Sequence, residues 1–595
     1  KVLRGRGDSA RVAALVGQAR AGLAAGDLAA ASKAVDAAAQ AVKADDADPK
    51  ALATYAAAVA ALDQLHAAQP DQLARARAAA AQLAKEAEDD PAAALAQAAA
   101  AGLDGAAGPP VKAAEQALER ALGKGTPDPE ALALLAARAL DRGEVSRAAG
   151  LYQRLEAAQA GTPRALLGAA RAAAGKGDLE AARAAVEKVL AKAKDHAPAR
   201  LEQAALAAQR GDDGEARAAL DALLAKEAAG ALAPRERARA LALSAALHGR
   251  RAGEAARAEQ AFDEALTADP KLAEVRLAAA AWRLRRGDFA AAVKIMEPLQ
   301  AGAAGQPAQA ELLIRGLAGA GRALDATRLA TQALAAAPGD PRLLMARAAI
   351  HEQAGERDPA AALYRQALER APDDVRPRVA LARLALAARD LPAAARELDA
   401  AVAKAPQHPD AQAALGDLRL AEGKPAEAEK AYLAALQLDP EFAPAELGLA
   451  QLAQARGDLP AAQAGLRRAL AVDPRSAAGH AALGLLLWRT GDLAGAEQAL
   501  AAAVSLAPAD PLPRIRLGAV KLERGDAAGA LADAEAGVGL QPGLAEGQHW
   551  LGRALLARGE VPQALQRLQK AVDLSPGDAT YLLHLGIAQE RGNAR

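Results

Sequence analysis

Residues 475–508, with the sequence RSAAGHAALGLLLWRTGDLAGAEQALAAAVSLAP, decide the fold. Two segments rich in Ala and Leu flank the Gly491-Asp492 pair, and Pro508 closes the stretch. Glycine takes the left-handed conformation at a helix end with little steric cost, and a following Asp can accept hydrogen bonds from the first amides of the next helix. Proline ends the second segment because it lacks an amide donor and clashes with the preceding turn. The stretch therefore predicts two helices joined by a tight turn.

Three features of this stretch recur every 34 residues over residues 239–578. The first row is proline, broken once by Ala304: Pro270, Pro338, Pro372, Pro406, Pro440, Pro474, Pro508, Pro542 and Pro576. Seventeen residues earlier stands a glycine row, broken once by Arg389: Gly253, Gly287, Gly321, Gly355, Gly423, Gly457, Gly491, Gly525 and Gly559. Five residues after it comes an unbroken alanine row: Ala258, Ala292, Ala326, Ala360, Ala394, Ala428, Ala462, Ala496, Ala530 and Ala564. Because the rows keep their phase without an insertion, they predict an array of helical hairpins.

Two further rows indicate how the hairpins pack. The alanine row lies where the two helices of a hairpin should meet, and a bulky residue there would force them apart. A larger residue four positions later shares the same helical face and is expected to fill the core. This row contains Phe262, Met296, Tyr364, Leu398, Tyr432, Leu466, Leu500 and Leu568, with Ala330 and Ala534 as exceptions. Leu-Gly pairs recur in the first helices at Leu415-Gly416, Leu483-Gly484, Leu517-Gly518, Leu551-Gly552 and Leu585-Gly586.

This spacing of Leu-Gly, Gly, Ala, a large residue and Pro resembles the tetratricopeptide-repeat family, whose unit has about 34 residues. The resemblance implies an all-α fold: an α-solenoid of stacked antiparallel helical hairpins, wound into a right-handed superhelix with the first helices on the concave wall. The sequence departs from the family pattern at the usual first-helix tryptophan, whose place is taken by Gln412, His480, Arg514 and Gln548.

The phase of the repeats divides the chain into five parts. These are degenerate helical hairpins at 1–128, three repeats at 129–230, a joint at 231–238, ten in-register repeats at 239–578 and a C-terminal capping helix at 579–595. In the first part we expect a hairpin at Gly26-Asp27 and helices near 50–67, 71–88, 91–102 and 111–123. The capping helix has no following hairpin to pack against.

The composition suits such an array and argues against other classes of protein. Hydrophobic residues make up 52% of the chain, and alanine, the best helix former, dominates among them. Aromatic residues make up only 2% of the chain. The 73 basic and 73 acidic residues are mixed, whereas nucleic-acid binders usually carry a basic excess. We therefore expect no nucleic-acid partner, and no apolar run approaches the roughly 18 residues of a membrane span.

The sequence offers no constellation of reactive residues. Cysteine is absent, and no two of the eight histidines share helical metal-ligand spacing with a carboxylate. We find neither a phosphate-binding loop nor a nucleophile with a base to activate it in this sequence. We therefore expect no catalytic, cofactor-binding or metal-binding residues.

A partner-binding groove is predicted at the C-terminal end of the array. First-helix residues spaced i, i+3, i+7 and i+10 should face the concave wall, and large apolar exposure marks interaction surfaces. The predicted groove residues are Leu485, Trp488, Ile515, Leu522, His549, Trp550, Arg553 and Ile587. The alternative is that curvature or the loose end of the array buries them as packing. The peptide-binding clamps known in the family rely on asparagine side chains. This sequence has a single asparagine, Asn593, so we do not expect it to bind peptides in that way.

These features predict a non-catalytic scaffold that binds extended peptides or helices of protein partners in its groove, within a multiprotein assembly. The alanine-rich, asparagine-poor composition suggests a GC-rich bacterium. Two alternatives remain open: a periplasmic scaffold for exopolysaccharide export, and the regulatory arm of an enzyme whose catalytic domain precedes Lys1. Sequence upstream of Lys1 would distinguish them, and with them a cytoplasmic from a periplasmic location.

Overall fold

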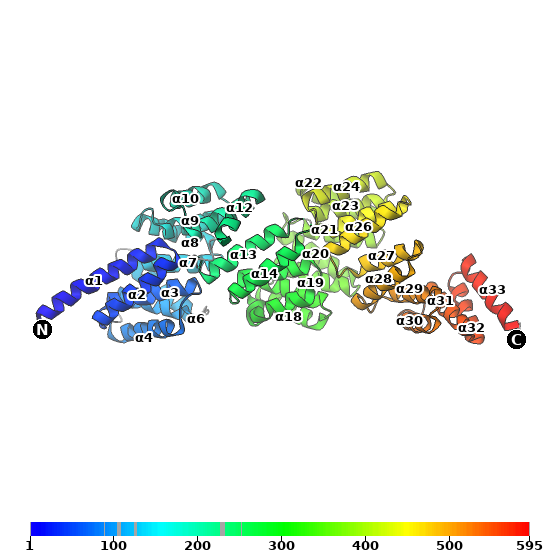
Figure 1. Ribbon diagram of the computed structural model, residues 1–595, viewed down its shortest axis with the longest axis horizontal. Coiled ribbons are helices and arrows are strands. Elements are labelled where there is room, and N and C mark those ends of the chain that lie inside the picture. Colours follow the sequence, from blue (N-terminus) through cyan, green and yellow to red (C-terminus); the bar gives the residue numbers. More distant parts are fainter. Residues whose placement is uncertain are drawn as a thin grey trace. The chain divides into compact units, whose positions relative to one another are not determined.

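The computed structural model describes residues 2–87, 90–103, 109–123, 128–225, 232–251 and 253–593. Within these residues the chain forms 33 α-helices and no strand (Figure 1). Within each unit most successive helices pack against one another, forming hairpins that stack on their neighbours. The predicted fold class, an all-α solenoid of stacked antiparallel hairpins, is confirmed.

The chain divides into two compact units. The first comprises residues 1–249 and 253–278, and the second comprises residues 250–252 and 279–595. The helix α15 (Ala273–Arg285) begins in the first unit and ends in the second. The other helices of the first unit are α1 (Val2–Ala25), α2 (Leu28–Ala44), α3 (Pro49–Gln64), α4 (Pro70–Glu86), α5 (Pro91–Ala101), α6 (Pro109–Leu122), α7 (Pro129–Asp141), α8 (Val145–Ala158), α9 (Pro163–Gly175), α10 (Leu179–Lys192), α11 (Ala197–Gln209), α12 (Asp213–Ala225), α13 (Pro234–His248) and α14 (Ala255–Ala268).

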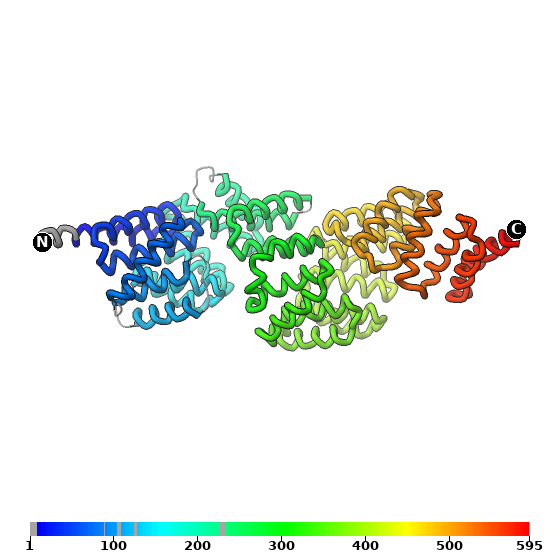
Figure 2. Tube along the Cα trace, turned by 90° about the horizontal axis from the view of Figure 1, so that it is seen from below, coloured from blue at the N-terminus to red at the C-terminus, as the bar shows by residue number. Residues whose placement is uncertain are grey.

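The second unit continues as a regular series of hairpins, which Figure 2 shows following one another in chain order from green to red. Its helices are α16 (Phe289–Met296), α17 (Pro307–Gly319), α18 (Ala323–Ala336), α19 (Pro341–Gln353), α20 (Arg357–Arg370), α21 (Arg376–Ala387), α22 (Leu391–Lys404), α23 (Pro409–Ala421), α24 (Pro425–Leu438), α25 (Ala443–Ala455), α26 (Leu459–Val472), α27 (Ala477–Arg489), α28 (Leu493–Leu506), α29 (Pro511–Glu523), α30 (Ala527–Leu540), α31 (Ala545–Ala557), α32 (Val561–Leu574) and α33 (Ala579–Asn593).

The turns have the chemistry expected from the glycine row. Every glycine of that row has a positive φ, between 68° and 92°, and Arg389 takes the same conformation with φ of 61°. The Asp that follows the turn caps the second helix; Asp458 and Asp492, for example, accept hydrogen bonds from the amides of Ala461 and Gly495. Each second helix ends before the proline, as α26 ends at Val472, two residues before Pro474. Glycine and Pro thus set the length of most hairpins, and Asp adds a cap in five of the ten repeats.

The alanine row forms a continuous seam inside the hairpins. All ten alanines are at most 1% exposed, and the larger residues four positions later are at most 3% exposed. Tyr432 of α24 lies between Gly416 of α23 and Gly448 of α25, and a Cβ at Gly416 would stand 2.5 Å from its ring. In the Leu-Gly pairs at Gly416, Gly484 and Gly552 the glycine therefore makes room for a core side chain, and Tyr432 is shared by two hairpins.

The break in the proline row at Ala304 has a visible cause. Pro298 falls inside what should be the second helix, so α16 ends at Met296 and the chain continues as a 3-10 helix, Glu297–Gly305. Proline cannot donate the hydrogen bond that would continue an α-helix, and short 3-10 segments commonly occur where α-helices end.

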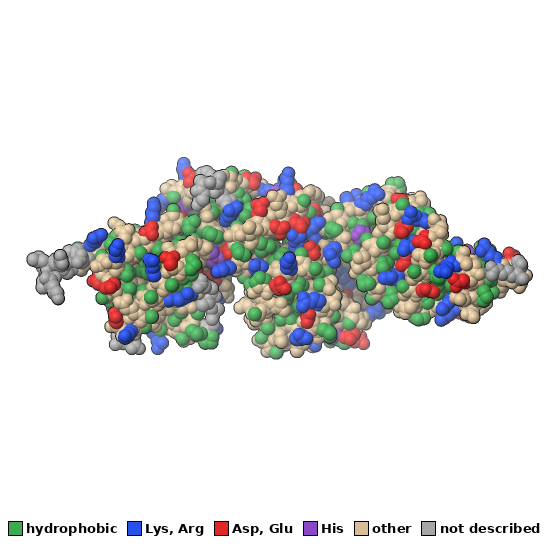
Figure 3. Space-filling model, turned by 60° about the horizontal axis from the view of Figure 1, so that its bottom comes forward, with side chains coloured by type: hydrophobic (Ala, Val, Ile, Leu, Met, Phe, Trp, Pro, Cys, Tyr) green, Lys and Arg blue, Asp and Glu red, His purple; other side chains and the backbone are tan. Residues whose placement is uncertain are grey.

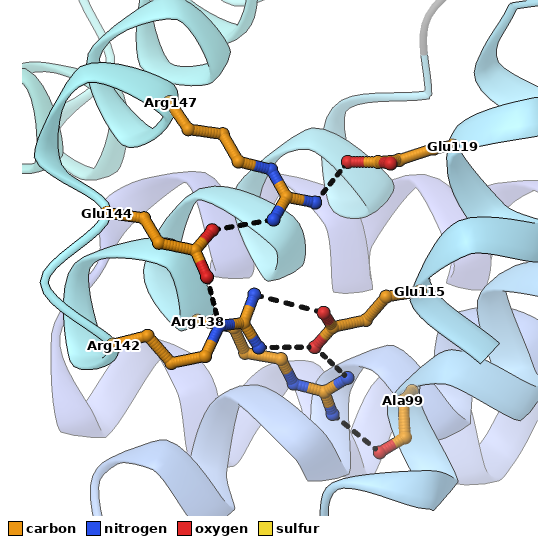
Figure 4. A network of polar contacts seen from close by, with 7 residues as sticks. All are labelled: Ala99, Glu115, Glu119, Arg138, Arg142, Glu144 and Arg147. Atoms are coloured by element: carbon orange, nitrogen blue, oxygen red, sulfur yellow. Dashed lines mark hydrogen bonds and ion pairs between the residues drawn. The ribbon is translucent and has the colours of Figure 1, made fainter. Parts of the chain in front are cut away.

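The N-terminal helices follow the predicted positions, and charged side chains link them. Glu115 of α6 is 3% exposed and accepts hydrogen bonds from Arg138 and Arg142, at 3.4 and 3.0 Å (Figure 4). Arg142 also contacts Glu144, and Arg147 bridges Glu144 and Glu119. Burial lowers the pKa of Arg138, although Glu115 opposes the shift. This network joins α6 to α7 and α8, where alanine alone would leave little packing.

Several predicted boundaries touch residues outside the described ranges. These are residue 88 at the end of a predicted helix, residue 231 at the start of the predicted joint, and residues 594–595 in the predicted capping helix. Where the joint is described, Leu232 and Ala233 are buried and α13 begins at Pro234, so 234–238 are helical.

The glycine of the Leu-Gly pair can be tested at two equivalent positions. Gly416→Ala should lower the free energy of unfolding by about 1–3 kcal/mol, because the added methyl group must displace the Tyr432 ring from a filled core. Gly586→Ala, at the same repeat position in α33, meets nothing within 4 Å and should be neutral or stabilising by up to about 1 kcal/mol. Thermal unfolding followed by circular dichroism would measure both, and equal losses would contradict the shared-core interpretation.

Arg389 offers a second test, since it is exposed and holds a conformation that favours glycine. Arg389→Gly should raise the free energy of unfolding by roughly 0.5–1 kcal/mol by removing the left-handed strain. Its matched control is Gly423→Arg, at the next turn, where nothing lies within 4 Å and only the backbone is strained. That change should be destabilising by a similar amount, and a loss of stability in both variants would refute the argument.

Candidate functional site

The structure brings part of the predicted groove together at the C-terminal end of the second unit. Trp488 of α27 and Trp550 of α31 are half-buried, with ring centroids 5.5 Å apart and planes tilted by 56°. The Arg553 guanidinium lies 4.5 Å from the Trp550 ring centroid, a cation–π distance. The Trp488 indole donates to Glu523 at 2.8 Å. These contacts hold two large rings in fixed positions without burying either one.

His549 was also predicted to face the groove, but it is buried against Trp550. It is only 2% exposed and contacts Trp550, Tyr581 and His584, with ring centroids 5.1, 4.7 and 4.9 Å away. Its Nε2 lies 3.1 Å from Nδ1 of His584, while its own Nδ1 has no hydrogen-bond partner among the described residues. Burial, helped by His584 and Arg553, lowers the pKa of His549 to about 4. The imidazole is therefore neutral at neutral pH.

We call the set Trp488, Trp550, Arg553, Tyr581 and His584 the aromatic surface. Two of its members, Tyr581 and His584, were missed by the sequence analysis. In the terminal helix the repeat spacing pointed to Ile587, which lies at another position. The rarity of aromatic residues in this chain was the signal that could have drawn attention to Tyr581.

Ile515 is a correction to the predicted groove. It was expected on the concave wall, but it is 0% exposed. A Cβ at Gly537 would lie 2.5 Å from its side chain and one at Gly547 2.9 Å, so these glycines of α30 and α31 admit the Ile515 side chain into the core. The spacing rule failed here because it uses positions within a single helix and takes no account of small residues on the neighbouring helices.

The remaining predicted residues are half-buried. Leu522 and Ile587 pack against the apolar core formed by α30 to α33, and Leu485 is half-buried on α27. Leu582 and Leu583 of α33 are among the exposed apolar side chains at this end, at 48% and 61%.

A second candidate site, which the sequence analysis did not predict, lies in the first unit. A cavity of about 700 Å³ is lined mostly by the odd-numbered helices α1, α3, α7, α9, α11 and α13. Its charged lining includes Arg164, Arg171, Glu202, Arg239, Lys271 and Glu274. The cavity is thus polar, in contrast to the aromatic surface of the second unit.

A chain of ion pairs crosses the wall of this cavity. Glu202 of α11 accepts from Arg171 Nε at 2.6 Å and from Arg239 Nη1 at 3.2 Å, and Arg239 Nε lies 3.0 Å from Glu274. Burial favours the neutral forms, but the attraction prevails: the pKa of Arg171 is raised and that of Glu202 is lowered. Glu236, which has no such direct partner, has its pKa raised by burial.

The first unit closes around this cavity through contacts between distant parts of the chain. Arg235, at the start of α13, donates to the Gln64 carbonyl at 3.0 Å and to Asp141 at 2.7 Å. His66, with φ of 56°, forms an ion pair with the buried Asp269. The turn after α3 therefore meets the start of α13 and the turn after α14, so the cavity is enclosed on this side.

Other kinds of site find no support in the described part of the chain. It contains no cluster of three or more His, Cys, Asp or Glu side chains able to hold a metal ion. None of its helices combines the length and the apolar character that a membrane span requires. Basic and acidic side chains are interspersed over the face shown in Figure 3.

The buried neutral His549 predicts a pH-dependent stability at the C-terminal end. The pKa of His549 in the folded protein, about 4, lies below the ordinary 6.5. The stability that the neutral imidazole contributes is therefore fully present above pH 6.5 and is lost as the pH falls towards 4. The loss should reach roughly 3 kcal/mol at most, at about 1.4 kcal/mol per pKa unit. Urea unfolding followed by tryptophan fluorescence at pH 7 and 4.5 would measure it, since two of the three tryptophans lie at this surface.

His549→Gln should reduce the difference between the two pH values, because the amide stays neutral throughout. His480→Gln is the control: this half-buried histidine of α27 bonds only the Pro474 carbonyl, and its replacement should leave the pH dependence intact. An unchanged pH dependence in His549→Gln would show that other groups cause it.

Comparison with known proteins agrees with the repeat assignment. Tetratricopeptide-repeat family models match residues 341–384, 379–441, 447–511 and 552–591, all in the second unit. No curated protein sequence matches the chain significantly.

Similar solved structures include the crystal structure of the APC/C hetero-tetramer Cut9-Hcn1, with 16% identity, a TM-score of 0.45, and coverage of 77% of this chain and 96% of that one. The crystal structure of MamA has 23% identity, a TM-score of 0.26, and coverage of 27% and 95%. Pseudomonas aeruginosa pilF has 18% identity, a TM-score of 0.33, and coverage of 40% and 99%.

Two of the family matches, 379–441 and 447–511, begin 68 residues apart, which is twice the 34-residue period of the glycine, alanine and proline rows. Repeats of this family are typically non-catalytic and serve as scaffolds for protein–protein interaction. The second unit of the chain therefore contains tetratricopeptide repeats.

Proposed function

We propose that this protein is a scaffold that gathers partners into a larger assembly, and that the aromatic surface binds a partner segment, either an extended peptide or a helix. The observation that carries the proposal is the contact between Trp488 and Trp550, two half-buried tryptophans in a chain that has only three. Tryptophan and arginine are enriched among the residues that dominate binding energies at protein interfaces.

The fold itself does not require a tryptophan at these positions. The residues at the repeat position of Trp550 in the two preceding hairpins are Arg516 and Ala482, and their helices pack in the same way. At the position of Trp488, the next two hairpins carry Leu522 and Leu556. A large amphipathic ring that packing does not demand is better explained by contact with another molecule.

The surroundings of the aromatic surface support the same proposal. Leu582 and Leu583 remain 48% and 61% exposed on α33, the helix that also carries Tyr581 and His584. Exposed apolar groups beside half-buried rings are typical of interaction surfaces. Arg553 adds a fixed cation that could orient an acidic or carbonyl group of the partner.

The double variant Trp550→Ala, Arg553→Glu tests the proposal. The full-length protein and the variant would be used to recover partners from an extract of the source organism, with quantitative mass spectrometry. Recovery of at least one partner should fall about tenfold or more, since loss of a dominant interface residue costs about 2 kcal/mol or more. Titration calorimetry with that partner would then measure the change in Kd directly.

The control is the double variant Leu433→Ala, Arg467→Glu, which changes one exposed apolar and one exposed basic residue on the second helices α24 and α26. It should recover the same partners as the unmodified protein. If the aromatic surface only packs the end of the array, Trp550→Ala, Arg553→Glu will unfold α31–α33 at lower temperature and leave partner recovery unchanged. That outcome would contradict the proposal.

A further inference from the structure

We propose that one face of α33 binds an amphipathic helix of a partner protein, which packs there as a second helix packs on the first helix of its hairpin. This terminal face consists of Leu582, Gly586, Gln589 and Asn593, spaced i, i+4, i+7 and i+11 along one side of the helix. Leu585 and Ala588 lie on another side of α33 and are buried. The inference goes beyond the proposed function, because Tyr581 and His584 of the aromatic surface are not part of the terminal face.

The equivalents of Gly586 in earlier hairpins show what the terminal face accepts. A Cβ at Gly552 of α31 would lie 2.6 Å from the side chain of Leu568, which belongs to α32. A Cβ at Gly484 of α27 would lie 2.7 Å from the side chain of Leu500, which belongs to α28. In each hairpin the large residue of the second helix thus enters the space that the glycine leaves on the first helix.

Gly586 itself is open. No described atom of another helix lies within 4 Å of a Cβ built at this position. Gly518, whose second helix carries Ala534 instead of a large residue, is still covered. A Cβ at Gly518 would stand 3.0 Å from the Ala530 carbonyl oxygen. Of the five Leu-Gly pairs of the repeat, only the last therefore has a glycine that no described helix covers.

Leu582 makes the first half of the terminal face apolar. It is 48% exposed, whereas Gln548, at the equivalent position of α31, is 0% exposed. The Gln548 side-chain oxygen lies 3.5 Å from Nη1 of Arg567 in α32, so the second helix contacts this position. A helix placed over Gly586 would in the same way remove Leu582 from water, and burial of apolar surface is the main favourable term in such packing.

The second half of the terminal face is polar and specifies a hydrogen-bonding residue on the incoming helix. Gln589 occupies the repeat position of Arg419, whose Nε lies 3.4 Å from Glu427 of the second helix. An amide both donates and accepts, so an amide of the incoming helix satisfies Gln589 without a charge. Because Glu427 precedes the large residue Tyr432 by five positions, the partner helix should carry a residue such as glutamine five positions before its large apolar residue.

The sequence of α32 meets these requirements and supplies a probe, since Gln563 and Leu568 stand five positions apart. A fluorescent, acetylated and amidated peptide of residues 559–575 would be titrated with the full-length chain and followed by anisotropy. The peptide should bind, and its Leu568→Asp form should bind at least about tenfold more weakly, because a carboxylate is costly to bury in an apolar slot. Absence of binding, or equal binding of the two peptides, would overturn the inference.

Blocking the slot on the protein provides the complementary test. Gly586→Leu should weaken binding of the unmodified peptide about tenfold, because the leucine occupies the space that the peptide side chain needs. The fold should be retained, which circular dichroism would verify, because the position is open and leucine favours the helix over glycine. Gly539→Leu is the control: this exposed glycine of α30 also has nothing within 4 Å, and its replacement should leave the affinity unchanged.

Two further outcomes would contradict the inference. Undiminished binding by Gly586→Leu would show that the peptide binds elsewhere, for example by exchange with α32. A dimer of the full-length chain that Gly586→Leu converts to a monomer, measured by sedimentation equilibrium without peptide, would assign the terminal face to a second copy instead of a partner helix. The peptide test involves none of the rings of the aromatic surface, so its outcome is independent of the proposed function.

Discussion

The close approach of two helices along a seam of alanines is the constraint on which the rest of the structure depends. Side chains of one methyl group, 0–1% exposed in all ten repeats, leave no room for a bulky residue between the helices of a hairpin. The apolar volume that a hairpin needs must then come from elsewhere. It comes from the larger residue four positions on, which can reach the neighbouring hairpin, as Tyr432 of α24 reaches Gly448 of α25. Stability therefore depends on contacts between adjacent hairpins, as expected for solenoids.

This constraint explains why the sequence predicted the fold so well. The seam, the left-handed turn and the proline each depend on contacts within about 34 residues, and each limits the residue type severely. Even the exceptions are informative. Arg389 keeps the positive φ of the glycines it replaces, so the packing of the hairpins determines the turn even where the residue disfavours it. Pro298, in contrast, changes the local structure from an α-helix to a 3-10 helix because no packing can restore a missing donor.

The candidate sites were less predictable, for a physical reason. The contact between His66 and Asp269 joins residues 203 positions apart, and the ion pairs of Glu202 come from helices before and after it in the stack. A repeat pattern says which residues face inward but not which of them meet after a superhelical turn. In the second unit the same limit appears at Ile515, whose burial depends on Gly537 and Gly547. Trp488, Trp550 and Arg553 lie close together because they come from first helices that are close in the sequence, and their role in a groove stays a prediction.

The separation between seam positions and inward positions also explains how one fold can carry two different surfaces. The seam tolerates almost no variation, whereas the repeat position of Trp550 accepts Arg516 and Ala482 without any change in the helices. Inward-facing residues of the first unit are rich in arginine and carboxylate, and those at the end of the second unit are aromatic. Because these positions contribute little to the shared core, their chemistry can differ from one hairpin to the next at small cost in stability. The binding chemistry of each unit is therefore set independently of the fold that presents it, and a change in one unit need not disturb the other.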